Sequence, residues 1–420
     1  MSRFTSESAK AAQRSLVLMY FVNGFSATAY VPLIPELINQ IGVNFVQWGT
    51  ILGFTGLGAL LPLTFTHRLV AQYGTRRVIR IAATLATVMM VLIPFSHNWV
   101  TFFVLQVLQT MSFSAFNISI NSSSVMLQKK MKKTIVGGMH AAWSIGAASS
   151  AFISGLLIPY FSMPVHIGIV GALCVLAYQL AGRKLLGKEN DGHTNESARA
   201  KKVPWLRTPA FVWLLTAGLF AGVWPEMVMI DWSSVFAKRA LLAEGGLIAI
   251  PYTCFTVAMI IGRLSIGPIT KRIHISEMSK WGGTVGAVML LLGTLLGPTF
   301  AATNPVLGMV VSCVFFGIAG LGVGPMVPSF FTAAGNVMGL TTAQALSRMS
   351  MVNMFVTLTA KTIMGALAQQ NMQVAFIFPT ITLFAAGIIS AFVVAKAKRN
   401  EDEMLTAFPM TGPIEVSDAD

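Results

Sequence analysis

The sequence predicts an all-α membrane protein, and two observations lead to this prediction. Hydrophobic residues make up 55% of the 420 positions and charged residues only 10%, whereas soluble domains average about 25% charged residues. The apolar residues also form runs of about 20 residues, the length that a helix needs to cross the hydrocarbon core of a bilayer. A water-soluble globule is therefore excluded, and we expect a bundle of membrane-spanning helices.

Twelve apolar runs, each bounded by charged or turn residues, are predicted to be the spanning helices. Their limits are placed to within a few residues. The runs cover residues 14–38, 47–66, 78–95, 100–126, 138–161, 165–181, 209–236, 246–267, 281–302, 306–331, 346–369 and 374–396.

The largest hydrophilic break divides these spans six and six. It covers residues 182–208 and reads as an inter-domain linker, because it is rich in charged and turn-forming residues. The expected parts are an N-terminal six-helix bundle (1–181), the linker (182–208), a C-terminal six-helix bundle (209–396) and a tail (397–420).

A weak internal likeness relates the two halves at an offset of about 205 residues. Gly58 precedes a basic turn, as Gly262 does, and segment 134–157 resembles segment 341–364. One known transporter architecture consists of two parallel six-helix repeats, with a binding site between them near the middle of the membrane. We therefore expect two pseudo-symmetric bundles.

Basic residues predict the orientation of the spans. Of the 29 lysine and arginine residues, 24 lie in the two terminal segments and in alternate connections, whereas the other connections contain only Lys238 and Arg239. Such an excess marks the cytoplasmic side. We expect both termini in the cytoplasm and the protein in a plasma membrane, as a bacterial inner membrane protein. The net charge of +14 does not indicate nucleic acid, because the basic residues lie between spans.

No motif for reaction chemistry or cofactor binding is present. The sequence lacks a Walker loop, a Cys-x-x-Cys pair, a His-x-x-x-His pair and a nucleophile elbow. Cys174, Cys254 and Cys313 all lie inside apolar runs and are predicted to be small buried residues. We expect neither an enzyme nor a bound metal or cofactor.

The segment 58–80, GALLPLTFTHRLVAQYGTRRVIR, resembles the signature loop between helices 2 and 3 of the major facilitator superfamily. The likeness includes Gly74, Arg76 and Arg77, although the acidic residue usual in this loop is missing. Other stretches resemble the MosC-like branch of sugar- and rhizopine-permease-like proteins. These are NISIN at 117–121, MHAAWSIGA at 139–147, PEMVMIDWSSVF at 225–236 and GPMVPSFFTAAG at 324–335.

The resemblance implies that spans one, four, seven and ten line a central cavity and that Gly74, Arg76, Arg77 and Arg263 belong to a cytoplasmic gate or loop. Polar side chains recur on one face of two of these spans. They are Gln106, Gln109, Phe113, Asn117 and Asn121 on span four, and Tyr20, Asn23 and Tyr30 on span one. They can bind a polar solute, or they can join helices by hydrogen bonds. The expected substrate-binding set is Asn23, Tyr30, Gln106, Gln109, Asn117 and Trp224.

Ionisable residues within spans are functional candidates by default. Glu226 of span seven and Lys361 of span eleven are expected at similar depths, about 25 Å and 22 Å along their helices. We expect them to pair, as a structural ion pair or as a titrating one with Asp231 assisting. Glu226, Asp231 and Lys361 are the predicted proton-coupling residues. Arg263 and Arg348 are expected to extend to the membrane surface.

The function expected from these features is secondary active transport of a small polar organic solute, such as a sugar or polyol, by alternating access. Proton-coupled uptake is the leading hypothesis. Efflux of amphipathic compounds and a non-transporting membrane sensor are the alternatives. The expected partners are the solute, a proton and the lipid bilayer, with neither nucleic acid nor an obligate protein partner.

Overall fold

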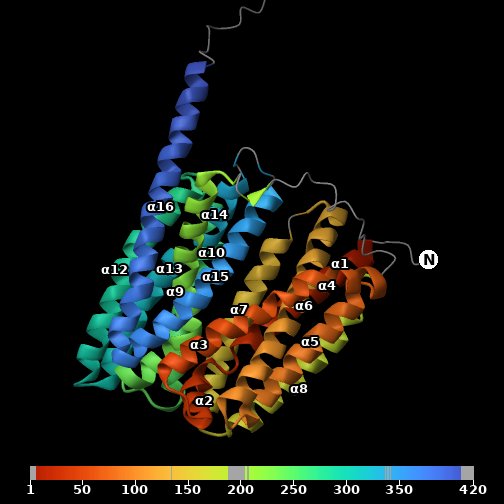
Figure 1. Ribbon diagram of the computed structural model, residues 1–420. Helices are drawn as coiled ribbons and strands as arrows, with labels where there is room; N and C mark the ends of the chain where they lie inside the picture. The colour runs from red at the N-terminus through yellow and green to blue at the C-terminus, as the bar shows by residue number, and fades with distance from the viewer. Residues whose placement is uncertain are drawn as a thin grey trace, which may run out of the picture.

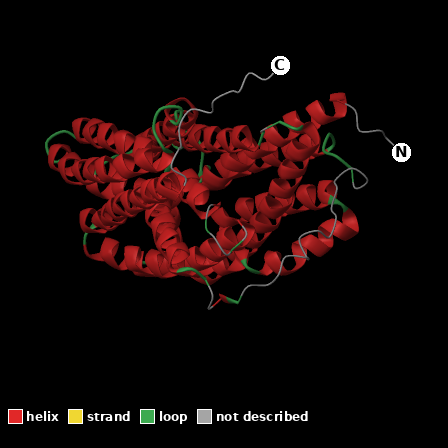
Figure 2. Cartoon of the chain, turned by 90° about the horizontal axis from the view of Figure 1, so that it is seen from above, coloured by secondary structure: helices red, strands yellow, loops and turns green. Residues whose placement is uncertain are grey.

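The computed structural model describes residues 6–133, 135–187, 204–205, 208–335, 337, 340 and 342–407. The regular elements in these ranges are helices joined by short loops (Figure 2). Most of the expected linker, and residues 408–420 of the expected tail, lie outside the described residues. Residues 397–407 of that tail instead continue the last helix, which extends beyond the rest of the bundle (Figure 1).

The helices of the first half correspond to the first six predicted spans. They are α1 (Ser6–Thr28) with η1 (Val31–Leu33) and α2 (Ile34–Ile41), α3 (Phe45–Thr55) with η2 (Gly56–Ala59) and α4 (Leu61–Tyr73), α5 (Thr75–Leu92) with η3 (Ile93–Phe95), α6 (Trp99–Met131), α7 (Val136–Leu157) and α8 (Met163–Gly182).

The helices of the second half correspond to the other six. They are α9 (Ala210–Ala240), η7 (Gly245–Ala249) with α10 (Ile250–Leu264) and α11 (Ile266–Ile269), α12 (Ile275–Ala301), α13 (Pro305–Val323) with α14 (Met326–Gly335), α15 (Thr342–Gln370) and α16 (Met372–Ala407).

Eleven of these helical segments, within the described residues, are long and apolar enough to cross a membrane. The predicted span that is not among them is α7. It has 22 residues and includes His140 with several glycines and serines, which lower its hydropathy. It nevertheless packs along α1 inside the bundle, so its small residues serve helix packing.

Local sequence explains where the helices break. Pro32 and Pro35 start new helical turns after Tyr30, which divides the first span into α1, η1 and α2. Asn44 begins α3 through a capping box with Gln47. Gly74 ends α4 and precedes α5 with a φ of +80°, a conformation that glycine adopts most easily.

The two ends of the bundle differ. One end, called the basic end below, carries the start of α1, the Gly74 turn, the loop between α6 and α7, and the far end of α16. The opposite end carries α2 and the start of α3 (Figure 1).

The two halves meet through matching helix pairs, α3 with α15 and α7 with α10. The paired helices approach closely because glycines of one half lie against the backbone of the other half. A Cβ atom on Gly53 would lie 2.7 Å from the carbonyl oxygen of Leu358, and one on Gly155 would lie 3.1 Å from that of Gly246. The Phe45 N–H also donates to Gln369 Oε1 at 2.9 Å. The halves are therefore packed tightly toward the opposite end.

Candidate functional site

Amide and hydroxyl groups of α1 and α6 form a hydrogen-bonded cluster. Asn23 Nδ2 donates to Asn117 Oδ1 at 3.2 Å. The Tyr20 hydroxyl donates to Asn121 Oδ1 at 2.6 Å and accepts from Ser124 Oγ at 3.2 Å. The structure thus brings together residues predicted to share a face. It also shows the helix-to-helix hydrogen bonding that was the alternative interpretation.

Gln106 extends this polar face along α6. It is only 8% exposed, and its Oε1 atom has no hydrogen-bond partner among the described residues. The half-buried Tyr30 phenol lies next to its amide, and Gln109 is half-buried one turn further along. A buried amide oxygen without a protein partner needs water or another polar molecule. Gln106 was predicted to bind the solute, and that role stays a prediction.

Glu226 pairs with Arg263, contrary to the predicted pairing with Lys361. Arg263 Nη2 lies 2.8 Å from Glu226 Oε2, and Nη1 donates to Ser144 Oγ of α7 at 3.2 Å. The expectation that Arg263 extends to the membrane surface is therefore wrong. Its guanidinium is held by a carboxylate of its own half and a hydroxyl of the other.

Lys361 pairs with Asp231, and the Nζ–Oδ2 distance is 2.8 Å. Glu226 and Asp231 are five residues apart on α9, so they point about 140° apart around the helix. Glu226 faces Arg263 of α10 and Asp231 faces Lys361 of α15. The predicted pairing of Glu226 with Lys361 is therefore wrong, because the partner of each side chain depends on how the helices are rotated and arranged.

Arg348 is also held inside the protein. It is buried, donates to the Thr208 hydroxyl and lies over the ring of Trp205. These groups belong to the end of the expected linker, so Arg348 is held by protein groups there, and its extension toward the membrane surface stays a prediction.

The polar cluster of the first half lies close to the ion pairs of the second. Tyr30 is within electrostatic range of Asp231. Tyr252 of α10 is buried within range of both carboxylates. His140 of α7 packs edge-on against Tyr20, with ring centroids 5.3 Å apart, and lies within electrostatic range of Arg263.

These residues are called the central polar group below. It consists of Tyr20, Asn23, Tyr30, Gln106, Gln109, Asn117, Asn121, His140, Ser144, Glu226, Asp231, Tyr252, Arg263 and Lys361. Among the described residues, no group of three or more histidine, cysteine and acidic side chains could hold a metal ion.

Trp224 does not lie with the central polar group. It is 1% exposed, stacks on Phe220 and contacts Phe378 of α16. Its position is in the core between α9 and α16, so we correct its assignment to the substrate-binding set.

Gly74, Arg76 and Arg77 lie at the turn between α4 and α5, as their sequence position implied. Arg77 is exposed and Arg76 half-buried at the basic end.

Three members of the central polar group, His140, Ser144 and Tyr252, were not among the predicted site residues. Ser144 is a common small residue on a helix rich in such residues, and Tyr252 lies in an otherwise apolar run. The only signal for Ser144 was its place within the stretch MHAAWSIGA. Their roles become visible only once α7 and α10 are side by side.

The fold and the central polar group define a class: a multi-spanning helical membrane protein that holds ionised side chains where its two halves meet. The chain belongs to the Major Facilitator Superfamily, whose sequence profile matches residues 16–343. It is accordingly a transporter and not an enzyme.

Curated relatives are similar over most of their length. An uncharacterized MFS-type transporter of Yersinia pestis is 24% identical over 372 residues, covering 87% of this chain and 91% of the relative. The membrane protein MosC of Rhizobium meliloti is 21% identical over 367 residues, covering 87% and 86%. The resemblance to the MosC-like branch is thereby confirmed.

Solved structures share the fold at low sequence identity. A bacterial homologue of the human lysosomal transporter Spinster, in an inward-facing and occupied conformation, has a TM-score of 0.69 and 13% identity, covering 93% of this chain and 98% of that one. A mutant form of the nucleoside transporter NupG has a TM-score of 0.70 and 13% identity, covering 91% and 99%. The predicted fold class is confirmed.

Proposed function

We propose that this protein is a secondary active transporter that takes up a small polar organic solute, such as a sugar or polyol, together with a proton. The observation that carries the proposal is the central polar group, which joins amides and phenols of the first half to two ion pairs of the second. Alternating access of two six-helix bundles, 1–181 and 209–396, would expose this group to each side of the membrane in turn.

The amide and phenol side chains of the first half supply the solute site in this proposal. Asn23, Tyr30, Gln106, Gln109 and Asn117 offer both donors and acceptors, as a hydroxyl-rich solute requires. The unpartnered Gln106 oxygen marks the centre of this site. The two ion pairs sum to zero charge, which favours a solute without net charge.

Glu226 is the proton-coupling residue in this proposal. Its charge orients Arg263, and Arg263 in turn donates to Ser144 in the other half. Protonation of Glu226 removes that charge and weakens the contact between the halves. The Asp231–Lys361 pair acts beside it, because Lys361 lies where α15 packs against α3. Proton binding is thereby linked to the relative movement of the halves.

The proposed orientation places the basic end in the cytoplasm, with the termini and the linker, in a bacterial inner membrane. Because the halves pack tightly toward the opposite end, the solute would reach the central polar group from the cytoplasm in this state. Gly74, Arg76, Arg77 and Arg263 would then lie along the cytoplasmic half of the pathway.

The test uses purified protein in proteoliposomes with an imposed pH gradient and a panel of radiolabelled sugars, polyols and amino acids. Wild-type protein should accumulate at least one solute, and a protonophore should abolish the accumulation. Glu226→Gln should lose accumulation but keep solute exchange at equal pH, because exchange needs no net proton release. Glu277→Gln, which removes a carboxylate paired with Lys280 near the basic end, is the matched control.

Full accumulation by Glu226→Gln would contradict the coupling role. Proton-driven export of amphipathic compounds, with no solute uptake, would support the efflux alternative and overturn the proposed direction.

A further inference from the structure

Two grooves flank the basic end of α1. The first, about 590 Å³, lies between α1 and α7, and the second, about 460 Å³, between α1 and α8. Arg14 and Leu18 line both. Neither groove contains a residue of the central polar group, so the proposed transport function leaves both unexplained.

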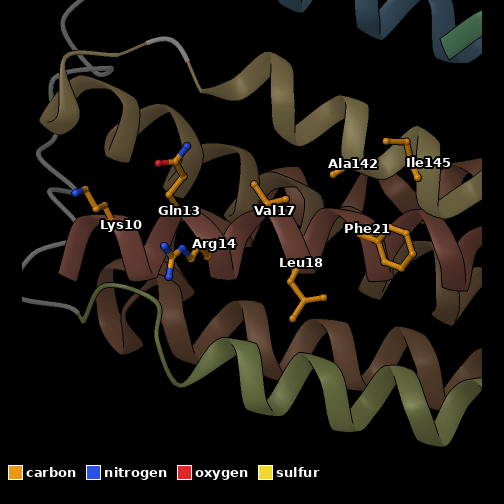
Figure 3. A pocket seen from close by; sticks show the side chains of 8 residues that line it. All are labelled: Lys10, Gln13, Arg14, Val17, Leu18, Phe21, Ala142 and Ile145. Atoms are coloured by element: carbon orange, nitrogen blue, oxygen red, sulfur yellow. The ribbon is translucent and has the colours of Figure 1, made fainter. Parts of the chain in front are cut away.

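The lining of these grooves changes from charged to apolar along α1. In the first groove Lys10, Gln13 and Arg14 lie toward one end, and Val17, Leu18 and Phe21 follow further along the helix (Figure 3). The second groove adds Arg183 and Lys184. Four cations thus gather at the basic end of the two grooves, and Glu7, in the first turn of α1, is the acidic residue of helices α1 and α8.

The apolar part of the grooves consists of exposed side chains on spanning helices. Leu18 is 44% exposed, Ile145 46% and Leu180 50%, and all three line the grooves. Large apolar side chains this exposed on a spanning helix are typical of a surface in contact with acyl chains. The occupant must therefore combine a negatively charged head with an apolar chain.

We propose that these grooves bind a phospholipid whose headgroup bears a net negative charge. Lys10, Arg14, Arg183 and Lys184 contact the phosphate, and an acyl chain lies along Val17, Leu18 and Ile145. Charge complementarity selects an anionic over a zwitterionic lipid, because four cations line the two grooves and helices α1 and α8 carry one carboxylate, Glu7. Because α7 also packs against α10 of the other half, a lipid between α1 and α7 stabilises a helix at the contact between the halves.

The test measures lipid binding to the full-length protein in detergent by native mass spectrometry, with phosphatidylglycerol and phosphatidylcholine as probes. Each cation near an anionic lipid surface contributes about fivefold in affinity. The double variant Lys10→Gln/Arg14→Gln should therefore bind phosphatidylglycerol about 30-fold more weakly. The matched control Lys129→Gln/Lys133→Gln removes one cation from the last turn of α6 and one from the α6–α7 connection, and it should bind like wild type.

Two further measurements separate a lipid site from a simple anion site. Val17→Trp, which fills the first groove without changing charge, should also weaken phosphatidylglycerol binding. Inorganic phosphate should neither compete with the lipid nor raise the Tm of the protein. Equal binding of both lipids, equal loss in the two double variants, or competition by phosphate would each overturn the proposal. Binding requires no transport, so these outcomes are independent of the proposed function.

Discussion

Each carboxylate on α9 is matched to a single cation on a different helix. Glu226 ties α9 to Arg263 of α10, and Asp231 ties it to Lys361 of α15. All four side chains are largely shielded from solvent. Removing one member of such a pair leaves an uncompensated charge, which costs more than removing both members.

Arg263→Gln is expected to destabilise the protein by about 2 kcal/mol, seen as a Tm lower by about 2 °C for a chain of this length, because Glu226 loses its counter-charge. The double variant Glu226→Gln/Arg263→Gln should recover about half of this loss. Thermal unfolding in detergent measures both.

The cross-pair Glu226→Gln/Lys361→Gln is the control for this measurement, and its two effects should add. The observed pairing would be contradicted if the effects of Glu226→Gln and Lys361→Gln on Tm were not additive while those of Glu226→Gln and Arg263→Gln were additive.

Among the helices, the contact between α3 and α15 depends on residues without side chains. Gly53 lies so close to the Leu358 carbonyl that a Cβ atom would force the helices apart. Gly56, one turn further along, has open space where its Cβ would be. The two glycines therefore provide a matched pair of positions for the same substitution.

Gly53→Ala is expected to loosen the opposite end of the bundle, and Gly56→Ala to leave it unchanged. Spin labels on the exposed residues Asn39 and Gln370 report the separation of the halves at this end. In a background without native cysteines, the distance distribution should broaden toward longer values for Gly53→Ala alone. Identical distributions for the two variants would show that this contact does not control the separation of the halves at the opposite end.

The sequence was sufficient to predict the spanning helices, because hydropathy and length depend only on local composition. The breaks inside spans were not predicted. The residues at these breaks, which are Pro32, Pro35 and the Gly56–Ala59 turn, lie within continuous apolar runs. Hydropathy averaged over a window of about 20 residues does not detect them. The polar face of α6 was predictable from its period.

The ion-pair partners were not predictable in the same way. Pairing depends on the rotation of α9 about its axis relative to α10 and α15. A local sequence pattern contains no information about that rotation. Trp224 was misassigned for a related reason: the sequence places it on a helix implied to line a cavity, but not on the side of that helix that faces α16.

For the molecule as a whole, the asymmetry of charge between its two ends predicts its orientation. Lys133 is exposed at the basic end, and Glu244 is exposed in the loop between α9 and α10 at the opposite end. In a cysteine-free background, Glu244→Cys should react with a membrane-impermeant maleimide in intact cells. Lys133→Cys should react only after the membrane is permeabilised. Reaction of both from outside would contradict the twelve-span topology.

The two ion pairs also determine how the membrane potential acts on the protein. Glu226 with Arg263 and Asp231 with Lys361 sum to no net charge, so an empty transporter that reorients around them moves no charge across the membrane. The potential then acts only on the cargo. For one proton carried with one neutral solute, 100 mV supplies about 2.3 kcal/mol, which corresponds to about a 50-fold concentration of the solute. In the proposed proton-coupled mechanism, neutral pairing would let the voltage drive the loaded step without opposing the return of the empty transporter.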